Sequence, residues 1–311
     1  MCGLRTRYST DLSDAEWEIL RPLVPAVRPG GRPAKHTRRE ILNALAVRPH
    51  TLVPAVTGLP TRDVPPLPTR RAAVGWMDTE RLNLHAAVDY AACHDRPGPA
   101  IAIAVATHGF LRTQGHWGQA IALHRTALNA AHHTNDQLAE ARALCYMGLL
   151  QSLTGDYEAA TTNLTRALRL CLDLGDHDGE SRALNYLGRV QQATGDYRAA
   201  ATNLTRALQL SRDIGDQNGE AESLNGMGEL SSACSRSAEA CTSYEQALAI
   251  ARDIGAPAEE ARALEGIGRC QLDDGRPGEG AAQLRQALAI YQRLGSPHAQ
   301  WVETTLRDHG L

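Results

Sequence analysis

The sequence predicts an all-α protein in which a helical-repeat solenoid follows a short N-terminal helical module. The main observation is a forty-residue period in the second half of the chain. Its markers are glycines at one phase and Ala-Leu pairs at another: Gly148, Gly188, Gly228 and Gly268; Ala167, Ala207, Ala247 and Ala287. Self-similarity at a fixed period indicates stacked supersecondary units rather than one globular core. Aromatic residues make up only 4% of the 311 residues, which favours closely packed helices with a Leu/Ala core.

The N-terminal residues 1–46 are predicted to form a small helix-turn-helix-like module. Ser13 begins a capping-box pattern ahead of a helix that carries Trp17, and Thr37 begins a second one ahead of Ile41. Residues 47–71 contain six prolines, and such a stretch cannot hold a helix. We therefore expect an extended linker there.

Residues 72–311 are predicted to form the solenoid. Asp78 is the expected N-cap of a helix over 79–92, and further helices are expected from Gly98-Pro99 and over 116–133. This first unit is degenerate, because position 108 is His where later units have Gly. Four clearer units follow, with first helices near 138–153, 178–193, 218–233 and 258–273. Their second helices are expected near 157–173, 197–213, 237–253 and 277–293, and a capping helix within 297–311.

Two kinds of glycine have distinct predicted roles within each unit. The pattern Leu-x-x-x-Gly, as in Leu184 and Gly188, fits a close crossing of the two helices. Gly175 and its equivalents suit the left-handed position after a helix, where a Cβ atom is penalised.

These small and apolar positions resemble the tetratricopeptide repeat family. In the first clear unit the matching residues are Leu144, Gly148, Ala160, Leu164 and Ala167, and the resemblance covers roughly residues 100–295. It implies a right-handed solenoid whose concave groove binds a protein or peptide and which carries no chemistry of its own. The family's aromatic residue in the first helix and its proline after the second helix are missing here.

The resemblance also implies which residues line the groove. They fall on one face of each first helix at spacings of three, seven and ten residues: Arg182, Asn185, Arg189 and Gln192; Glu222, Asn225, Glu229 and Ser232; Arg262, Glu265 and Arg269. An amide can both donate and accept, so Asn185 and Asn225 are expected to bind a peptide backbone. The alternative is a solvated helix face without a ligand.

Two further resemblances concern the segments upstream. The stretch from Gly75 to Leu84 resembles the lead-in to the repeat region of bacterial NB-ARC-type transcriptional regulators, although no G-x-x-x-x-G-K-[ST] motif of their ATPase is present. Residues 9–46 resemble the start of insertion-sequence DDE-type transposases, in which this module contacts DNA. The implied contact residues are Arg28, Arg32, Lys35, Thr37, Arg38 and Arg39.

These two contexts are unrelated, which suggests a chimeric reading frame in which an insertion element joined a regulator gene. Residues 1–50 carry nine basic and five acidic side chains, a net charge of +4, whereas the whole chain has −3. Three function classes are therefore considered. The first is an interaction scaffold, the second a DNA-binding regulator and the third an active transposase.

No enzymatic activity, metal or cofactor is expected. The repeated acids at Asp156, Asp176 and Asp196 are explained as helix caps, and His108, His116, His124 and His132 are spaced too widely along a helix to share a metal. The seven cysteines show no framework spacing, which is typical of a cytoplasmic protein with reduced thiols.

Overall fold

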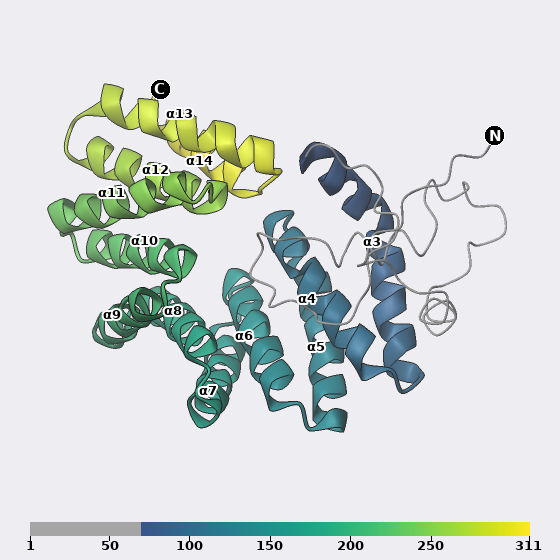
Figure 1. The fold of residues 1–311 in the computed structure, drawn as a ribbon. Coiled ribbons are helices and arrows are strands. Elements are labelled where there is room, and N and C mark those ends of the chain that lie inside the picture. Colours follow the sequence, from purple (N-terminus) through teal and green to yellow (C-terminus); the bar gives the residue numbers. More distant parts are fainter. Residues whose placement is uncertain (1–69) are drawn as a thin grey trace, which may run out of the picture. The chain divides into compact units, whose positions relative to one another are not determined.

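A computed structural model describes residues 70–311 of the chain. The predicted N-terminal module, nearly all of the linker and all six predicted DNA-contacting residues lie outside the described residues. Within residues 70–311 the regular structure consists of twelve α-helices (Figure 1). These helices are α3 (Arg70–Cys93), α4 (Pro97–Thr113), α5 (Trp117–Thr134), α6 (Gln137–Leu153), α7 (Tyr157–Leu174), α8 (His177–Ala193), α9 (Tyr197–Ile214), α10 (Gln217–Ala233), α11 (Ser237–Asp253), α12 (Pro257–Asp273), α13 (Pro277–Leu294) and α14 (His298–Asp308).

The described helices belong to two compact units. The first unit comprises the described residues up to Leu111 together with Ala122–Ala139. The second unit comprises Arg112–Ile121 and Glu140–Leu311. The second unit holds the four clear repeats, so it carries the candidate site.

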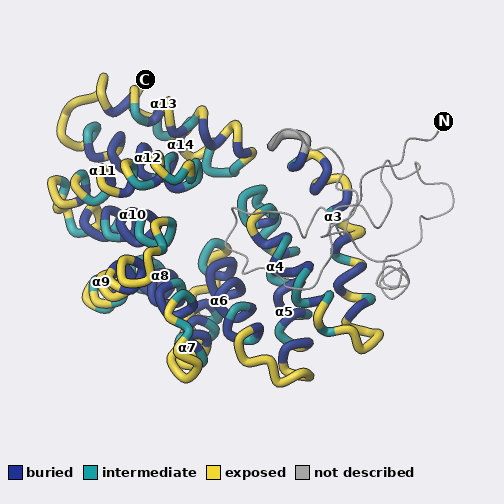
Figure 2. Tube along the Cα trace, in the orientation of Figure 1, coloured by how far each residue is buried: buried dark blue, intermediate teal, exposed yellow. Residues whose placement is uncertain are grey.

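Each clear repeat is an antiparallel pair of helices, and α8 packs on α9, α10 on α11 and α12 on α13. The first helices of successive repeats also contact one another, α8 with α10 and α10 with α12. Figure 1 shows the helices from α8 to α13 stacked in chain order, with α13 at the top. Figure 2 shows that the first helices are buried along most of their length, whereas the second helices expose more residues to solvent.

The glycines at the Leu-x-x-x-Gly positions stand where the two helices of a repeat cross. A Cβ atom at Gly148 would lie 2.5 Å from Leu164 Cγ, and one at Gly188 would lie 2.7 Å from Leu204 Cγ. At Gly228 the neighbour is the Tyr244 ring. Such approaches are too close for any side chain, so the predicted close crossing is confirmed.

The helix ends follow the predicted capping chemistry. Asp156, Asp176 and Asp196 each accept a backbone N–H from the first turn of the next helix, at 3.1 or 3.2 Å. Gly175 and Gly215 follow their helices in the left-handed region, with φ of 67° and 72°. The repeated acids therefore act as caps.

The prediction for the start of the first described helix is wrong. Asp78 is not an N-cap, because α3 begins at Arg70 and continues through it. The buried side chains Ala73, Trp76 and Met77 recur at helical spacing ahead of Leu84. This apolar stripe extends the helix upstream of Asp78 and into the end of the predicted linker.

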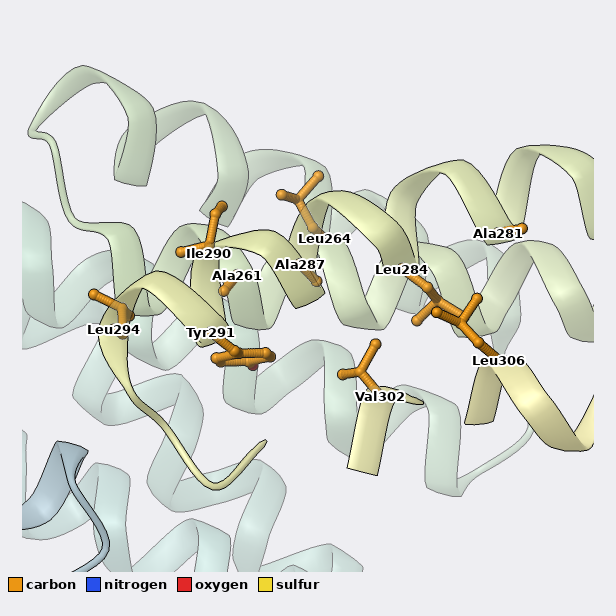
Figure 3. Packing of buried hydrophobic residues seen from close by; sticks show 10 residues of the cluster. All are labelled: Ala261, Leu264, Ala281, Leu284, Ala287, Ile290, Tyr291, Leu294, Val302 and Leu306. Carbon is orange, nitrogen blue, oxygen red and sulfur yellow. The ribbon is translucent and has the colours of Figure 1, made fainter. Parts of the chain in front are cut away.

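The last repeat is closed by α14, as predicted. Val302 and Leu306 lie buried against Leu284, Tyr291 and other apolar residues of α12 and α13 (Figure 3). A terminal helix of this kind covers an apolar face that the next repeat would otherwise cover.

Candidate interaction surface

The polar residues predicted to line the groove lie on α8, α10 and α12, and we call them the first-helix face. The set comprises Arg182, Asn185, Arg189, Gln192, Glu222, Asn225, Glu229, Arg262 and Arg269. Because α8, α10 and α12 stack in order, these residues form one continuous polar surface along three repeats.

Two ion pairs cross this surface from one repeat to the next. Arg189 Nη1 lies 3.9 Å from Glu222 Oε1, and Arg262 Nε donates to Glu229 Oε1 at 2.7 Å. Both pairs join the same two phases of the forty-residue period, but their charges are reversed. The surface therefore alternates in charge along its length.

A third carboxylate, Glu259, joins Arg262 to the repeat before it. Arg262 Nη1 donates to Glu259 Oε2 at 3.1 Å. Asn225 Nδ2 donates to both the backbone oxygen and the Oε2 atom of Glu259, at 3.1 and 3.0 Å. Asn225 has no exposed surface. Its amide group therefore links α10 to α12, and this conformation does not present it to a peptide.

The charges of this cluster stabilise one another. Burial raises the pKa of Glu222, and the nearby Glu259 raises it further. Burial also favours the neutral form of Glu229, but the guanidinium groups of Arg262 and Arg189 overcome that effect and lower its pKa. Burial disfavours the charged Arg262, yet Glu229 and Glu259 hold its pKa well above the ordinary value. At neutral pH, Arg262, Glu229 and Glu259 are therefore ionised.

Several side chains of the first-helix face are enclosed by protein and yet remain partly accessible to solvent. Burial exerts the largest single influence on the pKa of Arg189, Glu229 and Arg262. Nevertheless, 22% of the Arg189 side chain, 32% of Glu229 and 15% of Arg262 remain accessible. Enclosure combined with partial access is what we expect of side chains that line a groove, and the proposal below builds on it.

Several buried polar atoms on the first-helix face have no hydrogen-bond partner among residues 70–311. They are Asn185 Oδ1, Gln192 Oε1, Asn225 Oδ1 and Arg262 Nη2. Buried polar groups are nearly always hydrogen-bonded. These atoms are shielded in this conformation, and a movement of the side chains would make them available to a bound molecule or to water.

The two ends of the first-helix face are occupied differently. Arg182 Nη2 donates to both oxygens of Asp178 at 3.0 Å, and its guanidinium lies 5.9 Å from the centre of the Tyr146 ring. Arg269 is exposed and pairs with Glu265 at 2.7 Å. Glu265 also accepts a hydrogen bond from the Tyr291 hydroxyl at 3.0 Å.

The sequence does not predict the parts played by Glu259 and Tyr291. Glu259 lies in the first turn of α12 and Tyr291 lies on a second helix, α13. Neither occupies one of the repeat positions that are predicted to line the groove. A signal for the ion pairs is nevertheless present, because positions 189 and 222 and positions 229 and 262 carry opposite charges at one spacing of 33 residues.

In the first unit, two histidines meet at the positions where a glycine and a leucine meet in the later repeats. His108 Nδ1 and His124 Nε2 lie 3.0 Å apart, sixteen residues apart in sequence. Gly148 and Leu164 meet at the same separation in the next repeat, as do Gly188 and Leu204. Burial lowers the pKa of His124 to about 3, so its ring is neutral. Helical spacing alone does not predict this contact, because it joins two helices.

Neither a membrane-spanning helix nor a cluster of metal ligands occurs within residues 70–311. The described helices include none with both the length and the apolar character needed to cross a membrane. Nor does this part of the chain bring three or more His, Cys, Asp or Glu side chains together as metal ligands.

Solved structures with a similar arrangement of helices share little sequence with this chain. BtubC (BKLC) from P. vanneervenii matches with a TM-score of 0.53 at 18% identity, over 71% of this chain and 92% of that chain. The apo form of RapI matches with a TM-score of 0.57 at 13% identity, over 71% and 79%. A Rap protein complexed with Competence and Sporulation Factor matches with a TM-score of 0.57 at 12% identity, over 71% of this chain and 63% of that chain.

At identities this low, these likenesses establish the fold alone. No protein with a curated description matches the sequence. The profile of the tetratricopeptide repeat family matches residues 152–213 and 219–309, which include α8 to α13. The repeats of this chain are therefore tetratricopeptide repeats.

Proposed function

We propose that this chain is a non-catalytic interaction scaffold that binds a segment of a partner protein in the recess of the first-helix face. The observation that carries this proposal is the combination of enclosure and accessibility at Arg189, Glu229 and Arg262. A recess of mixed charge fits an extended or helical peptide with both acidic and basic side chains.

The unpartnered polar atoms support the same proposal. Asn185 Oδ1 and Gln192 Oε1 can accept from a peptide N–H, and Arg262 Nη2 can donate to a peptide carbonyl or carboxylate. Asn225 serves the contact between repeats instead. A similarly folded Rap protein holds Competence and Sporulation Factor, so the architecture is compatible with holding a ligand.

The proposal is tested by selecting peptides from a random library against the full chain and measuring their affinity by fluorescence anisotropy. Replacing Asn185 and Arg189 together with alanine should weaken binding at least about tenfold, because contacts in a desolvated recess dominate affinity. Arg198→Ala on the exposed side of α9 is the matched control. The control should bind like the unsubstituted chain, and unchanged affinity in the double variant would show that the binding surface lies elsewhere.

We further propose that the N-terminal residues give weak, salt-sensitive binding to duplex DNA, as a regulator fragment or transposase-derived module would. The supporting observation is the net charge of +4 over residues 1–50. Anisotropy of labelled duplex DNA with the full chain at low and moderate salt tests this. Replacing Arg32, Arg38 and Arg39 with alanine should abolish the binding, and affinity equal to that of the unsubstituted chain would exclude these residues.

A reducing compartment such as the cytoplasm suits the thiols of the described residues. Cys145, Cys171 and Cys270 are buried and unbonded to one another, and burial raises the pKa of Cys171 to about 12. Protonated, buried thiols of this kind behave as small apolar side chains.

A further inference from the structure

Two cysteines lie together where the third clear repeat meets the fourth. Cys241 is on α11, the second helix of the third repeat, and Cys270 is on α12, the first helix of the fourth. Cys241 packs against the apolar cluster that contains Cys270. Both are free thiols. Their side chains therefore meet across two neighbouring helices, which is the first requirement for a disulfide between them.

The other contacts between repeats have no cysteine at these two positions. Forty residues earlier, Ala201 on α9 packs against the cluster that contains Leu230 of α10. Forty residues before that, the same positions hold Thr161 and Val190. Packing between repeats therefore requires neither thiol, and the two cysteines occur as a pair at one contact.

The two thiols differ in their access to solvent. Cys241 is partly exposed, whereas Cys270 is buried. The Cys270 sulfur also lies 3.8 Å from the hydroxyl of Ser232 on α10, so it sits where three helices meet. An external reagent can reach Cys241 first, and Cys270 is in place to react with Cys241. This arrangement suits a reaction in two steps.

We propose that Cys241 and Cys270 form a dithiol modification site, which a small disulfide such as oxidised glutathione converts into an internal disulfide between α11 and α12. The Cys241 thiolate, formed by loss of a proton to water, attacks one sulfur of the reagent, so that a mixed disulfide forms and one thiolate leaves. The Cys270 thiolate then attacks the Cys241 sulfur and displaces the second thiolate. The two cysteines lose two electrons and two protons, and the reagent becomes two thiol molecules.

The first step is slow at neutral pH. Burial raises the pKa of Cys241 to about 11, and the charge and the hydrogen bond of the neighbouring Cys270 thiol add to this effect. The carboxylates of Asp274 and Glu245 also disfavour a negative charge at Cys241. Only the thiolate attacks, so the rate should rise about tenfold for each pH unit below the pKa. The site therefore responds to a sustained oxidising environment and not to a brief one.

Equilibration with glutathione tests the site in the full chain. Cys2 and the exposed Cys93 are replaced by serine, which prevents disulfides between molecules at these positions. The chain is incubated with mixtures of oxidised and reduced glutathione at mildly alkaline pH until its composition no longer changes. It is then quenched with acid and alkylated, and its disulfides are identified by peptide mass spectrometry. The linked peptides of Cys241 and Cys270 should be the main product.

Cys270→Ala is the matched control. It should stop at the mixed disulfide of Cys241 with glutathione, because the second thiol is absent. Cys145 and Cys171 are both buried and should stay reduced in either chain. Oxidation should also raise the urea concentration at which the chain with both cysteines unfolds, since a disulfide restricts the unfolded state. The same treatment should not raise that concentration for Cys270→Ala, and circular dichroism verifies that both chains are folded.

Three results would each overturn the proposed site. They are a mixed disulfide that persists at Cys241 although Cys270 is present, a disulfide that involves Cys234 instead, and an unmodified Cys241 at equilibrium. None of them bears on the proposed peptide binding, because neither Cys241 nor Cys270 belongs to the first-helix face. The two proposals therefore fail independently.

Discussion

At the residue scale, the glycine at each helix crossing is the residue of its repeat that is hardest to replace, because it has no side chain. Glycine in a helix interior costs about 1 kcal/mol relative to alanine. The sequence keeps it at four crossings because the partner helix occupies the space that a Cβ atom would need. Packing therefore outweighs helix propensity at these positions.

Gly188→Ala should lower the free energy of unfolding by about 1–2 kcal/mol, because overpacking exceeds the gain in helix propensity. The new Cβ atom would lie 2.7 Å from Leu204 Cγ and 3.3 Å from the Ala200 carbonyl. Urea denaturation followed by circular dichroism measures the change. Gly278→Ala in α13 is the control, since nothing lies within 4 Å of its Cβ position. Equal effects of the two substitutions would refute the packing argument.

The His108–His124 pair predicts a pH dependence of the first unit. The pKa of His124 falls from 6.5 to about 3 on folding, because burial disfavours its charged form. Below pH 6.5 the unfolded chain takes up a proton that the folded chain does not. Stability from this group is therefore constant above pH 6.5 and is lost at about 1.4 kcal/mol per pH unit as the pH falls toward 3.

The test is the double substitution His108→Gly and His124→Leu, which installs the glycine-leucine contact of the later repeats. Between pH 6.5 and pH 5 the unsubstituted chain should lose more stability than this variant, as measured by urea denaturation at each pH. Both chains share their other titrating groups, so the difference in slope reports the pair. Parallel slopes would show that His124 is not responsible.

The sequence predicts the role of a residue when that role is played within one repeat, but not when it depends on contacts with another helix. The crossing glycines and the capping aspartates Asp156 and Asp176 act locally and recur with the period, so their roles follow from phase alone. The histidine contact and the role of Asn225 depend on how two helices approach, which spacing along one helix does not determine. Asn225 has the predicted phase, but the first turn of α12 covers it and accepts its hydrogen bonds.

At the element scale, the ion pairs between α8, α10 and α12 join neighbouring first helices. Arg262 is the centre of this arrangement, because it contacts both Glu229 and Glu259. Removing one partner from an enclosed ion pair leaves the other charges unpaired. The alternating charges therefore have a structural role as well as the proposed binding role.

Arg262→Gln should lower the free energy of unfolding by about 1–3 kcal/mol, less than for a fully buried pair because the site retains some access to solvent. It should also raise the pKa of Glu229 and Glu259, since Arg262 is the largest lowering influence on both. Denaturant unfolding and carboxyl titration by NMR measure the two effects. Arg236→Gln removes an exposed pair with Glu239 and should leave the free energy of unfolding nearly unchanged.

The helices themselves are predictable from the sequence where the period is strong. Each predicted helix of the four clear repeats begins and ends within one residue of the structure, because the forty-residue period fixes its position. Capping aspartates mark the starts of α6 to α9 as well. The start of α3 is not predictable from capping alone. There the apolar stripe of Ala73, Trp76 and Met77 prevails over the capping signal at Asp78.

At the scale of the whole molecule, the repeat array needs a distinct end. Val302 is fully buried in α14 and packs with residues of α12 and α13 (Figure 3). Val302→Ala should destabilise the last repeat by about 2 kcal/mol through the cavity it leaves. The exposed Arg307→Ala on the same helix is the control. Because repeats are stabilised by their neighbours, hydrogen exchange should increase first in α12 and α13. A uniform increase over all repeats would contradict this order.

The sequence predicts the solenoid and the phase of its polar face, but neither how far that face is enclosed nor the hydrogen bond from Gln114 to the backbone oxygen of Leu294. Curvature accumulates from small rotations between repeats, which depend on packing over the whole array. Gln114 and Leu294 are 180 residues apart, and their hydrogen bond does not recur with the forty-residue period, so the sequence pattern does not reveal it.

The most direct test of the central claim is to locate a bound peptide. A library-selected peptide with a photoreactive benzophenone at its centre is cross-linked to the full chain, and the attached residues are identified by mass spectrometry. We expect the peptide to be attached to α8, α10 and α12, near Arg189, Glu229 and Arg262. Attachment confined to the outer helices α9, α11 and α13 would contradict the assignment of the first-helix face as the binding surface.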